Sequence, residues 1–220
     1  MTEVKLCGIT TPAAMPAAVG AGADLVGFVF FPRSPRAVTP AEAAALSAAH
    51  PGGPARVALL VDPDDAAIEA VLAAFRPDLI QLHGEETPAR CAEVRARFGL
   101  PVMKALGIAA EEDLAALEAY APAVDRFLLD AKPPPGAALP GGNAAAFDWQ
   151  LLAGLRIPRP WLLAGGLTPA NVAAAVRMAG APGVDVSSGV ERARGVKDPA
   201  LVEAFVQAAR EACLRAARGA

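Results

Sequence analysis

The sequence predicts an α/β protein, a single (βα)8 TIM barrel that forms one domain over residues 1–220. Short, nearly all-apolar runs alternate with Ala-rich helical runs along the whole chain, as expected for parallel strands buried on both faces. Eight such pairs, spaced by about 20 to 35 residues, favour a closed barrel. The chain also lacks a G-x-G-x-x-G fingerprint near its start, which disfavours the alternative fold, an open doubly wound sheet.

The eight strands are predicted at 4–7, 25–30, 56–61, 79–82, 102–106, 126–130, 161–164 and 184–186. The helices are predicted at 12–21, 40–49, 64–75, 88–98, 111–119, 144–152, 169–178 and 199–215. Five helices have a capping residue followed by proline at the first helical position: Thr11-Pro12, Thr39-Pro40, Thr87-Pro88, Thr168-Pro169 and Asp198-Pro199. Gly99 and Gly180 are predicted to end their helices.

Composition excludes several classes of function. A net charge of −3 argues against a nucleic-acid or anionic-membrane surface. The 3 cysteines are far apart and form no C-x-x-C pattern, which indicates neither a zinc site nor a disulfide framework. No apolar stretch is long enough to span a bilayer, and the first strand begins too early for a signal peptide. We therefore expect a soluble, cytoplasmic protein.

The last two strands predict a phosphate site. The strand at 161–164 runs into Gly165-Gly166, and the strand at 184–186 runs into Ser187-Ser188-Gly189. Glycine-exposed N–H groups after the seventh and eighth strands, with a short helix pointing inward, bind phosphate in many barrels. Each motif alone is typical of a tight turn, but their order favours a phosphorylated small-molecule ligand.

Polar side chains end several apolar strands. Cys7, His83 and Asp130 close the first, fourth and sixth strands, and Asp185 lies within the eighth. Such groups are costly to bury unless they are paired or used. Cys7 and Asp130 come from opposite sides of the ring, so a base and an acid could flank one substrate. Alternatively, Cys7 is a small core residue and His83 a hydrogen-bonded core histidine.

Lys5 shares a strand face with Cys7, and closure makes the first and eighth strands neighbours. We therefore predict a Lys5–Asp185 ion pair inside the barrel, in preference to a Schiff-base role for Lys5. The positive charge and the helix start at Pro12 are expected to lower the pKa of Cys7.

Two loops are long, those at 31–39 and 131–144, and length at this face suggests a substrate cover or a plain surface loop. Within the first, Arg36 is braced by Pro35 and is a candidate for carboxylate or phosphate recognition, whereas Arg33 is interpreted as a solvated arginine.

Taken as an ordered set, the motifs resemble the N-(5′-phosphoribosyl)anthranilate isomerase family of tryptophan biosynthesis. They are Val4-Lys5-Leu6-Cys7-Gly8-Ile9-Thr10, Gly27-Phe28-Val29-Phe30, Ser34-Pro35-Arg36, Gln81-Leu82-His83-Gly84, Leu128-Leu129-Asp130, Phe147-Asp148-Trp149, Gly165-Gly166-Leu167-Thr168-Pro169 and Asp185-Val186-Ser187-Ser188-Gly189-Val190-Glu191. One departure is Gly141-Gly142-Asn143-Ala144, where the family usually has Gly-Gly-Thr-Gly.

The resemblance implies an Amadori rearrangement of an aminoaldose phosphate with no metal or organic cofactor. It implies that Asp130 is the general acid and Cys7 the general base. The substrate-binding residues that we expect from motifs and resemblance are Arg36 for the anthranilate carboxylate, with His83, Gly165, Gly166, Asp185, Ser187, Ser188 and Gly189. The sequence leaves monomer and homodimer open.

Two other hypotheses compete with this one. A different phosphosugar barrel is possible, but an epimerase needs metal ligands that 2 histidines supply poorly. The related histidine-pathway isomerase generally has a carboxylate in place of Cys7. A non-catalytic barrel that binds a phosphorylated metabolite is disfavoured by the presence of both Cys7 and Asp130.

Overall fold

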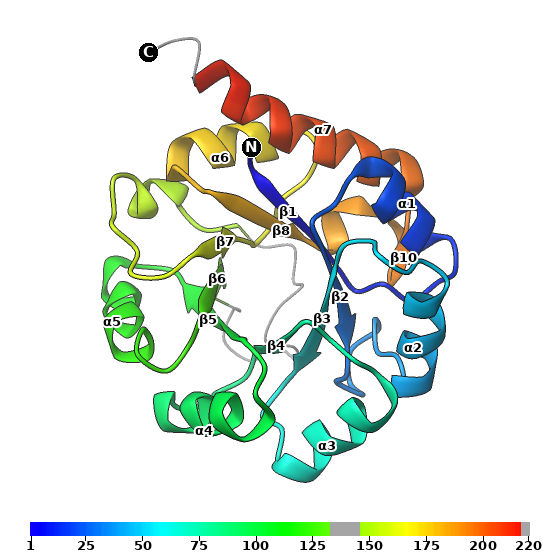
Figure 1. Cartoon of the computed structure of the whole chain (residues 1–220). Helices are drawn as coiled ribbons and strands as arrows, with labels where there is room; N and C mark the ends of the chain where they lie inside the picture. The colour runs from blue at the N-terminus through cyan, green and yellow to red at the C-terminus, as the bar shows by residue number, and fades with distance from the viewer. Residues whose placement is uncertain (133–145, 217–220) are drawn as a thin grey trace.

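The computed structural model describes residues 1–132 and 146–216, with side chains through residue 212. Eight parallel strands form a closed barrel in sequence order, and β1 pairs with β8 (Figure 1). The predicted TIM barrel is therefore confirmed, and the open sheet is wrong. The strands are β1 (Glu3–Cys7), β2 (Leu25–Val29), β3 (Ala55–Leu60), β4 (Leu79–Leu82), β5 (Val102–Ile108), β6 (Arg126–Ala131), β7 (Trp161–Leu163) and β8 (Gly183–Val186).

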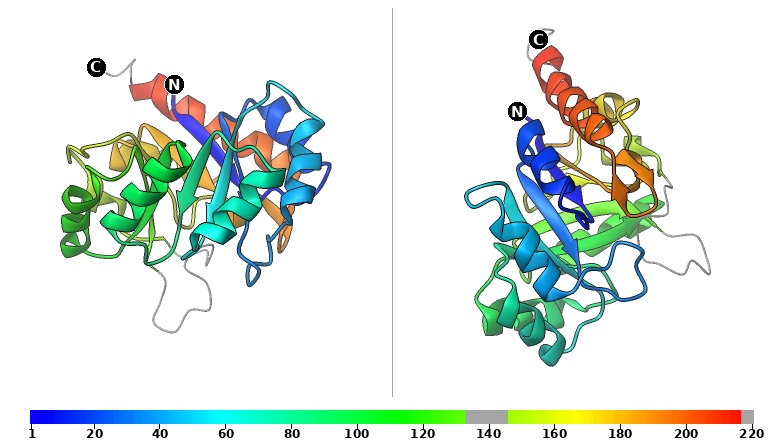
Figure 2. Two further views of the ribbon diagram at one scale, coloured as in Figure 1. Left: turned by 60° about the horizontal axis from the view of Figure 1, so that its bottom comes forward. Right: turned by 90° about the vertical axis from the view of Figure 1, so that its right-hand side faces the viewer.

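Helices surround the barrel on its outside (Figure 1). They are α1 (Ala14–Ala21), α2 (Pro40–Ala48), α3 (Asp65–Ala74), α4 (Pro88–Phe98), α5 (Ala116–Tyr120), α6 (Val172–Ala179) and α7 (Pro199–Ala216), with 3-10 turns η1 (Glu111–Ala115), η2 (Trp149–Leu152) and η3 (Ser188–Val190). The long α7 packs against α1 and α6 and closes the ring near the start of β1 (Figure 2). No helix within the described ranges is long and apolar enough to cross a membrane.

Alternation along the strands divides the apolar residues between two cores. Side chains such as Val4 and Leu6 face the helices and belong to the larger cluster. Leu25, Met103 and Leu128 face inward and belong to a second, smaller cluster that fills the inside of the barrel. Polar residues replace apolar ones toward the carboxyl ends of the strands. The side chains that can take part in catalysis therefore lie at one mouth of the barrel.

Most predicted helix signals are confirmed. Thr39 and Thr87 accept hydrogen bonds from the backbone N–H three residues later, and Asp198 caps α7 through Ala200 and Leu201. Gly99 and Gly180 follow their helices in the left-handed conformation, with φ of 66° and 63°.

Three helix predictions are wrong at their starts. Thr11 caps nothing with its side chain, because the chain turns through 11–13 before α1 begins at Ala14. Likewise α6 begins at Val172, since Asn171 accepts a hydrogen bond from the Thr168 N–H and holds a separate turn. Of the helix predicted at 144–152, the described part contains only the single turn η2.

The sequence analysis also missed a two-stranded hairpin after β8. It pairs β9 (Glu191–Ala193) with β10 (Val196–Lys197) and turns at Gly195, whose φ is 82°. Because it follows β8 after the single turn η3, the hairpin lies at the carboxyl-end mouth of the barrel.

Candidate active site

The carboxyl ends of β1 and β8 meet in a buried ion pair. Lys5 Nζ donates to Asp185 Oδ1 at 2.8 Å, and the two residues are register partners. The Lys5 side chain is fully buried. The predicted pair is confirmed, and Oδ1 of the Asp185 carboxylate is the atom that accepts the hydrogen bond from Lys5.

Space for the thiol and the ammonium group comes from Gly27 in β2. A Cβ at this position would lie 3.0 Å from Cys7 Sγ and 3.3 Å from Lys5 Nζ. Any larger residue here would displace one of the two groups. The glycine therefore allows both side chains to occupy the same layer of the barrel.

The predicted lowering of the Cys7 pKa is wrong. Burial raises the pKa of the Cys7 thiol, and the nearby carboxylate of Asp185 adds to this effect, although Lys5 opposes it. The helix start that was expected to help lies further along the chain, at Ala14. In the free protein the group is therefore a thiol near neutral pH.

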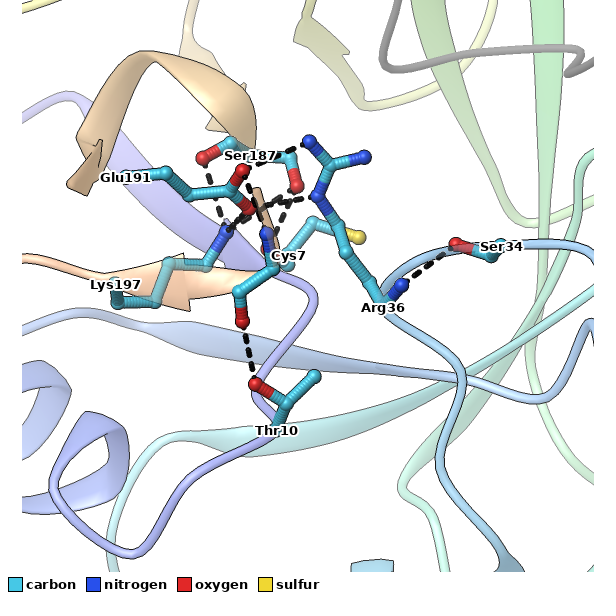
Figure 3. Close-up of polar contacts among 8 residues, drawn as sticks. Cys7, Thr10, Ser34, Arg36, Ser187, Glu191 and Lys197 are labelled. Carbon is cyan, nitrogen blue, oxygen red and sulfur yellow. Dashed lines mark hydrogen bonds and ion pairs between the residues drawn. The ribbon is translucent and has the colours of Figure 1, made fainter. Parts of the chain in front are cut away.

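Arg36 is held by an acidic residue from the hairpin (Figure 3). Its Nε and Nη2 atoms donate to the two carboxylate oxygens of Glu191 at 2.7 and 2.9 Å. Arg36 is only 6% exposed, and its stem packs on Gly8, the residue after Cys7. The bidentate pair fixes the guanidinium plane and leaves Nη1 outside the pair.

Lys197 extends this cluster toward Cys7. Its Nζ atom donates to Glu191 Oε1 at 2.9 Å and to the carbonyl oxygen of Ser187 at 2.9 Å. Ser187 Oγ in turn donates to the Cys7 carbonyl oxygen at 3.0 Å. Burial lowers the pKa of Lys197 even though Glu191 opposes the effect. For Glu191, the hydrogen bond from Arg36 and the charge of Lys197 outweigh burial and lower the pKa to about 2.

The hairpin also touches the loops after β1 and β2. Thr10 Oγ1 donates to the Gly195 carbonyl oxygen at 2.6 Å. A Cβ on Gly195 would lie 2.7 Å from the Pro35 carbonyl oxygen, so only glycine fits this approach. Glu191 and Lys197 are therefore site residues that sequence reasoning missed. The alternation of polar and small residues around Arg194-Gly195 was the available signal.

Asp130 ends β6 on the other side of the mouth. Its Oδ1 atom accepts from the Ala131 N–H at 2.8 Å, and its Oδ2 atom lies 3.5 Å from His83 Nε2. A cavity of about 300 Å³ opens beside both side chains. It is lined by His83, Gly84, Glu85, Lys104, Ala105, Leu106, Gly107, Tyr120, Asp130 and Lys132. His83 therefore lies at the site and not in the apolar core.

The glycine loops after β7 and β8 lie next to this acid. Gly165 and Gly166 have φ of 86° and 61°, and a Cβ on Gly165 would lie 3.1 Å from Asp130 Oδ1. Among the described residues, no acceptor takes the N–H of Gly165 or Gly166. Gly189 fits against the Leu167 carbonyl oxygen so closely that a Cβ would overlap it. The two loops thus pack together, with Ser188 and Gly189 in the turn η3.

The structure brings together most of the residues predicted for the site. Cys7, Arg36, Asp185 and Ser187 lie on the side of β1, β2 and β8, and His83 and Asp130 lie beside the cavity. The departure at Gly141-Gly142-Asn143-Ala144, and most of the predicted cover at 131–144, lie outside the described residues.

A closed parallel barrel with titratable side chains at the carboxyl ends of its strands is the architecture of the (βα)8-barrel enzymes. Within that class the chain belongs to the N-(5′-phosphoribosyl)anthranilate isomerase family, whose family model matches residues 4–208. The chain is thus an isomerase of tryptophan biosynthesis, as the motifs implied.

Similar proteins cover nearly the whole chain. A relative from Paracoccus denitrificans, named N-(5′-phosphoribosyl)anthranilate isomerase, is 63% identical and covers 93% of this chain and 95% of its own. A crystal structure of the isomerase from Thermotoga maritima has a TM-score of 0.85 at 37% identity, covering 96% of this chain and 100% of its own. Another phosphoribosylanthranilate isomerase structure, in complex with reduced 1-(o-carboxyphenylamino)-1-deoxyribulose 5-phosphate, has a TM-score of 0.83 at 35% identity over 96% and 100%.

These similarities decide between the hypotheses raised by the sequence. The family match favours phosphoribosylanthranilate isomerase over a different phosphosugar barrel and over a non-catalytic binding barrel.

Proposed function

We propose that the chain converts N-(5-phospho-β-D-ribosyl)anthranilate to 1-(2-carboxyphenylamino)-1-deoxy-D-ribulose 5-phosphate by acid–base catalysis at Asp130 and Cys7. The observation that carries this proposal is the placement of a thiol at the end of β1 and a carboxyl group at the end of β6, at one mouth. The related complex with the reduced product supports the choice of substrate.

In the first step the Asp130 carboxylic acid gives its proton to the ribose ring oxygen. The C1′–O bond breaks while the anthranilate nitrogen forms a double bond to C1′, which leaves a cationic Schiff base and an Asp130 carboxylate. In the second step the Cys7 thiolate removes the C2′ proton, and the electrons neutralise the Schiff base to give an enolamine. The enolamine then takes a proton at C1′, loses the proton of its C2′ hydroxyl group, and becomes the ketone.

The raised pKa of Cys7 fits this order of events. A thiol is a poor base, but the positive charge of the Schiff base that forms on ring opening would favour the thiolate. The thiol therefore releases its proton to solvent mainly after the ring has opened, and the resulting thiolate is the base. Lys5 supplies a second positive charge that favours the thiolate.

The remaining residues bind the substrate. The glycine loops, with Gly165, Gly166, Ser188 and Gly189, would take the phosphate through backbone N–H groups. Arg36 would bind the anthranilate carboxylate through its remaining N–H donors, chiefly those of Nη1, since Glu191 takes the Nε–H and one Nη2–H. Ser187 braces the backbone of Cys7, and Asp185 holds Lys5, so both would act on the substrate through their neighbours.

A turnover assay with phosphoribosylanthranilate tests the two catalytic assignments. Cys7→Ser and Asp130→Asn should each lower kcat by at least about 10²-fold, the usual contribution of a general acid or base. Cys91→Ala changes a buried thiol in α4, away from the mouth, and should leave kcat nearly unchanged. Normal turnover by Cys7→Ser would contradict the base assignment.

A further inference from the structure

Gln81 is a buried polar residue that the proposed mechanism does not use. It is fully buried in β4, between Leu59 in β3 and Met103 in β5. Among the described residues its Oε1 atom has no hydrogen-bond partner. A half-satisfied amide inside a barrel costs free energy, so stability does not explain its presence.

The other end of the Gln81 amide contacts His83. Gln81 Nε2 lies 3.0 Å from His83 Nδ1. An amide nitrogen can only donate, so this contact requires Nδ1 to accept, and in the neutral ring the proton then resides on Nε2. His83 Nε2 is the atom that faces Asp130 Oδ2, at 3.5 Å. The amide thus directs the N–H of the ring toward the acid.

We propose that Gln81 is a positioning residue that holds His83 as the Nε2–H tautomer, and that this N–H stabilises the Asp130 carboxylate formed as the substrate ring opens. The inference rests on the proposed role of Asp130 as the acid. No additional proton is transferred: Asp130 loses its proton to the ring oxygen, and His83 strengthens its hydrogen bond to the anion left behind. The interaction favours the transition state over the ground state, because the negative charge develops only as the proton leaves.

The surroundings leave this contact free to tighten. His83 and Asp130 both line the cavity, together with the charged or titratable side chains of Glu85, Lys104, Tyr120 and Lys132. Lys104 is engaged by Glu86 at 2.8 Å and Lys132 by Asp113 at 2.6 Å. A catalytic hydrogen bond that is long in the free protein and short in the complex is common in enzymes.

The tautomer can be measured directly by ¹⁵N NMR of the histidine rings in the wild-type protein. The chain has 2 histidines, so His50→Gln assigns both spectra and serves as the control. We expect the neutral His83 ring to carry its proton on Nε2, and Gln81→Leu to convert it to a mixture of tautomers. A proton on Nδ1 in the wild type would overturn the inference without any variant.

Kinetics separate positioning from substrate binding. Gln81→Leu and His83→Asn should lower kcat by roughly 10- to 100-fold, as expected for one hydrogen bond to a charged group, with little change in KM. Gln81→Glu should be at least as impaired as Gln81→Leu, because a carboxylate accepts a hydrogen bond from Nδ1–H and therefore favours the opposite tautomer. A raised KM with unchanged kcat would make His83 a substrate ligand and overturn the inference.

Comparison with Asp130→Asn distinguishes the two levels of the proposal. If Asp130→Asn turns over normally, the acid assignment itself fails. If Asp130→Asn is inactive while Gln81→Leu is fully active, only the role of Gln81 fails. When both roles hold, Gln81→Leu should have no further effect in the Asp130→Asn background.

Discussion

On the side of β1, β2 and β8, the cations Lys5, Arg36 and Lys197 each have a carboxylate partner at 2.7 to 2.9 Å. On the side of β4 and β6, the one titratable side chain within 4 Å of the Asp130 carboxylate among the described residues is His83, at 3.5 Å, and a cavity of about 300 Å³ lies beside the pair. The half that holds the proposed base is therefore built before the substrate arrives. The half that holds the proposed acid has room to respond to it.

The largest effect is expected from breaking the innermost ion pair. Lys5→Met leaves the Asp185 carboxylate buried and uncompensated, which should destabilise the fold by roughly 3–5 kcal/mol. Lys5→Met with Asp185→Leu removes both charges and should recover most of this loss. Urea unfolding measures both, and Arg97→Met on the exposed face of α4 is the control. If Lys5→Met were as stable as the wild type, the ion pair between Lys5 and Asp185 would not contribute to the stability of the fold.

The next effect comes from Glu191, whose ordinary pKa of 4.5 falls to about 2 on folding. A carboxyl group with a depressed folded pKa stabilises the fold above its unfolded pKa, and the effect is lost as the pH falls through the folded value. Glu191→Gln should therefore cost about 3 kcal/mol above pH 4.5 and almost nothing near pH 2. Unfolding at several pH values measures this, with exposed Glu203→Gln as the control. A pH-independent difference would contradict the charge-based explanation.

A smaller effect is expected from the proposed carboxylate-binding residue. Arg36→Ala should raise KM by roughly tenfold, through the loss of one charged hydrogen bond, and leave kcat closer to wild type. Arg33→Ala, in the same loop and exposed, is the matched control. If both variants have the KM of the wild type, Arg36 does not bind the substrate carboxylate and acts only as an ion-pair partner of Glu191.

The smallest effect is a difference between two pH profiles of the unmodified enzyme. The kcat/KM profile reports the free protein, so it should rise with pH toward a pKa above the ordinary Cys7 value of 9.0. The kcat profile should rise at a pH lower by about 1 unit or more, because the cationic Schiff base favours the thiolate. Coincident profiles would contradict generation of the base after ring opening.

Closure of the barrel was the part of the structure that the sequence predicted best. Eight strands predict a closed barrel, and closure makes β1 and β8 neighbours. Their register then makes Lys5 and Asp185 partners, so the ion pair could be predicted from the number of strands. Helix starts were harder, because the turns at 11–13 and at Thr168 use the same residue types as caps.

The electrostatics of the site depended on burial, which the sequence could not supply. The sign of the Cys7 pKa shift was wrong because the desolvation of a buried thiol exceeds the attraction of one ammonium group. Glu191 and Lys197 were missed because their partners are 155 positions and 10 positions away, through contacts that exist only after the hairpin folds back on the mouth.

The contacts of the hairpin set a limit on redesign of this barrel. Arg36 on the loop after β2 is clamped by Glu191, and Gly195 sits against the carbonyl group of Pro35. A replacement loop after β2 that lacks the arginine would remove one of the two cationic partners of the buried Glu191 carboxylate. A replacement loop after β8 that lacks the glycine would collide with the Pro35 carbonyl oxygen. In a design that exchanges loops to change the substrate, the loop after β2 and the hairpin after β8 therefore have to be exchanged together.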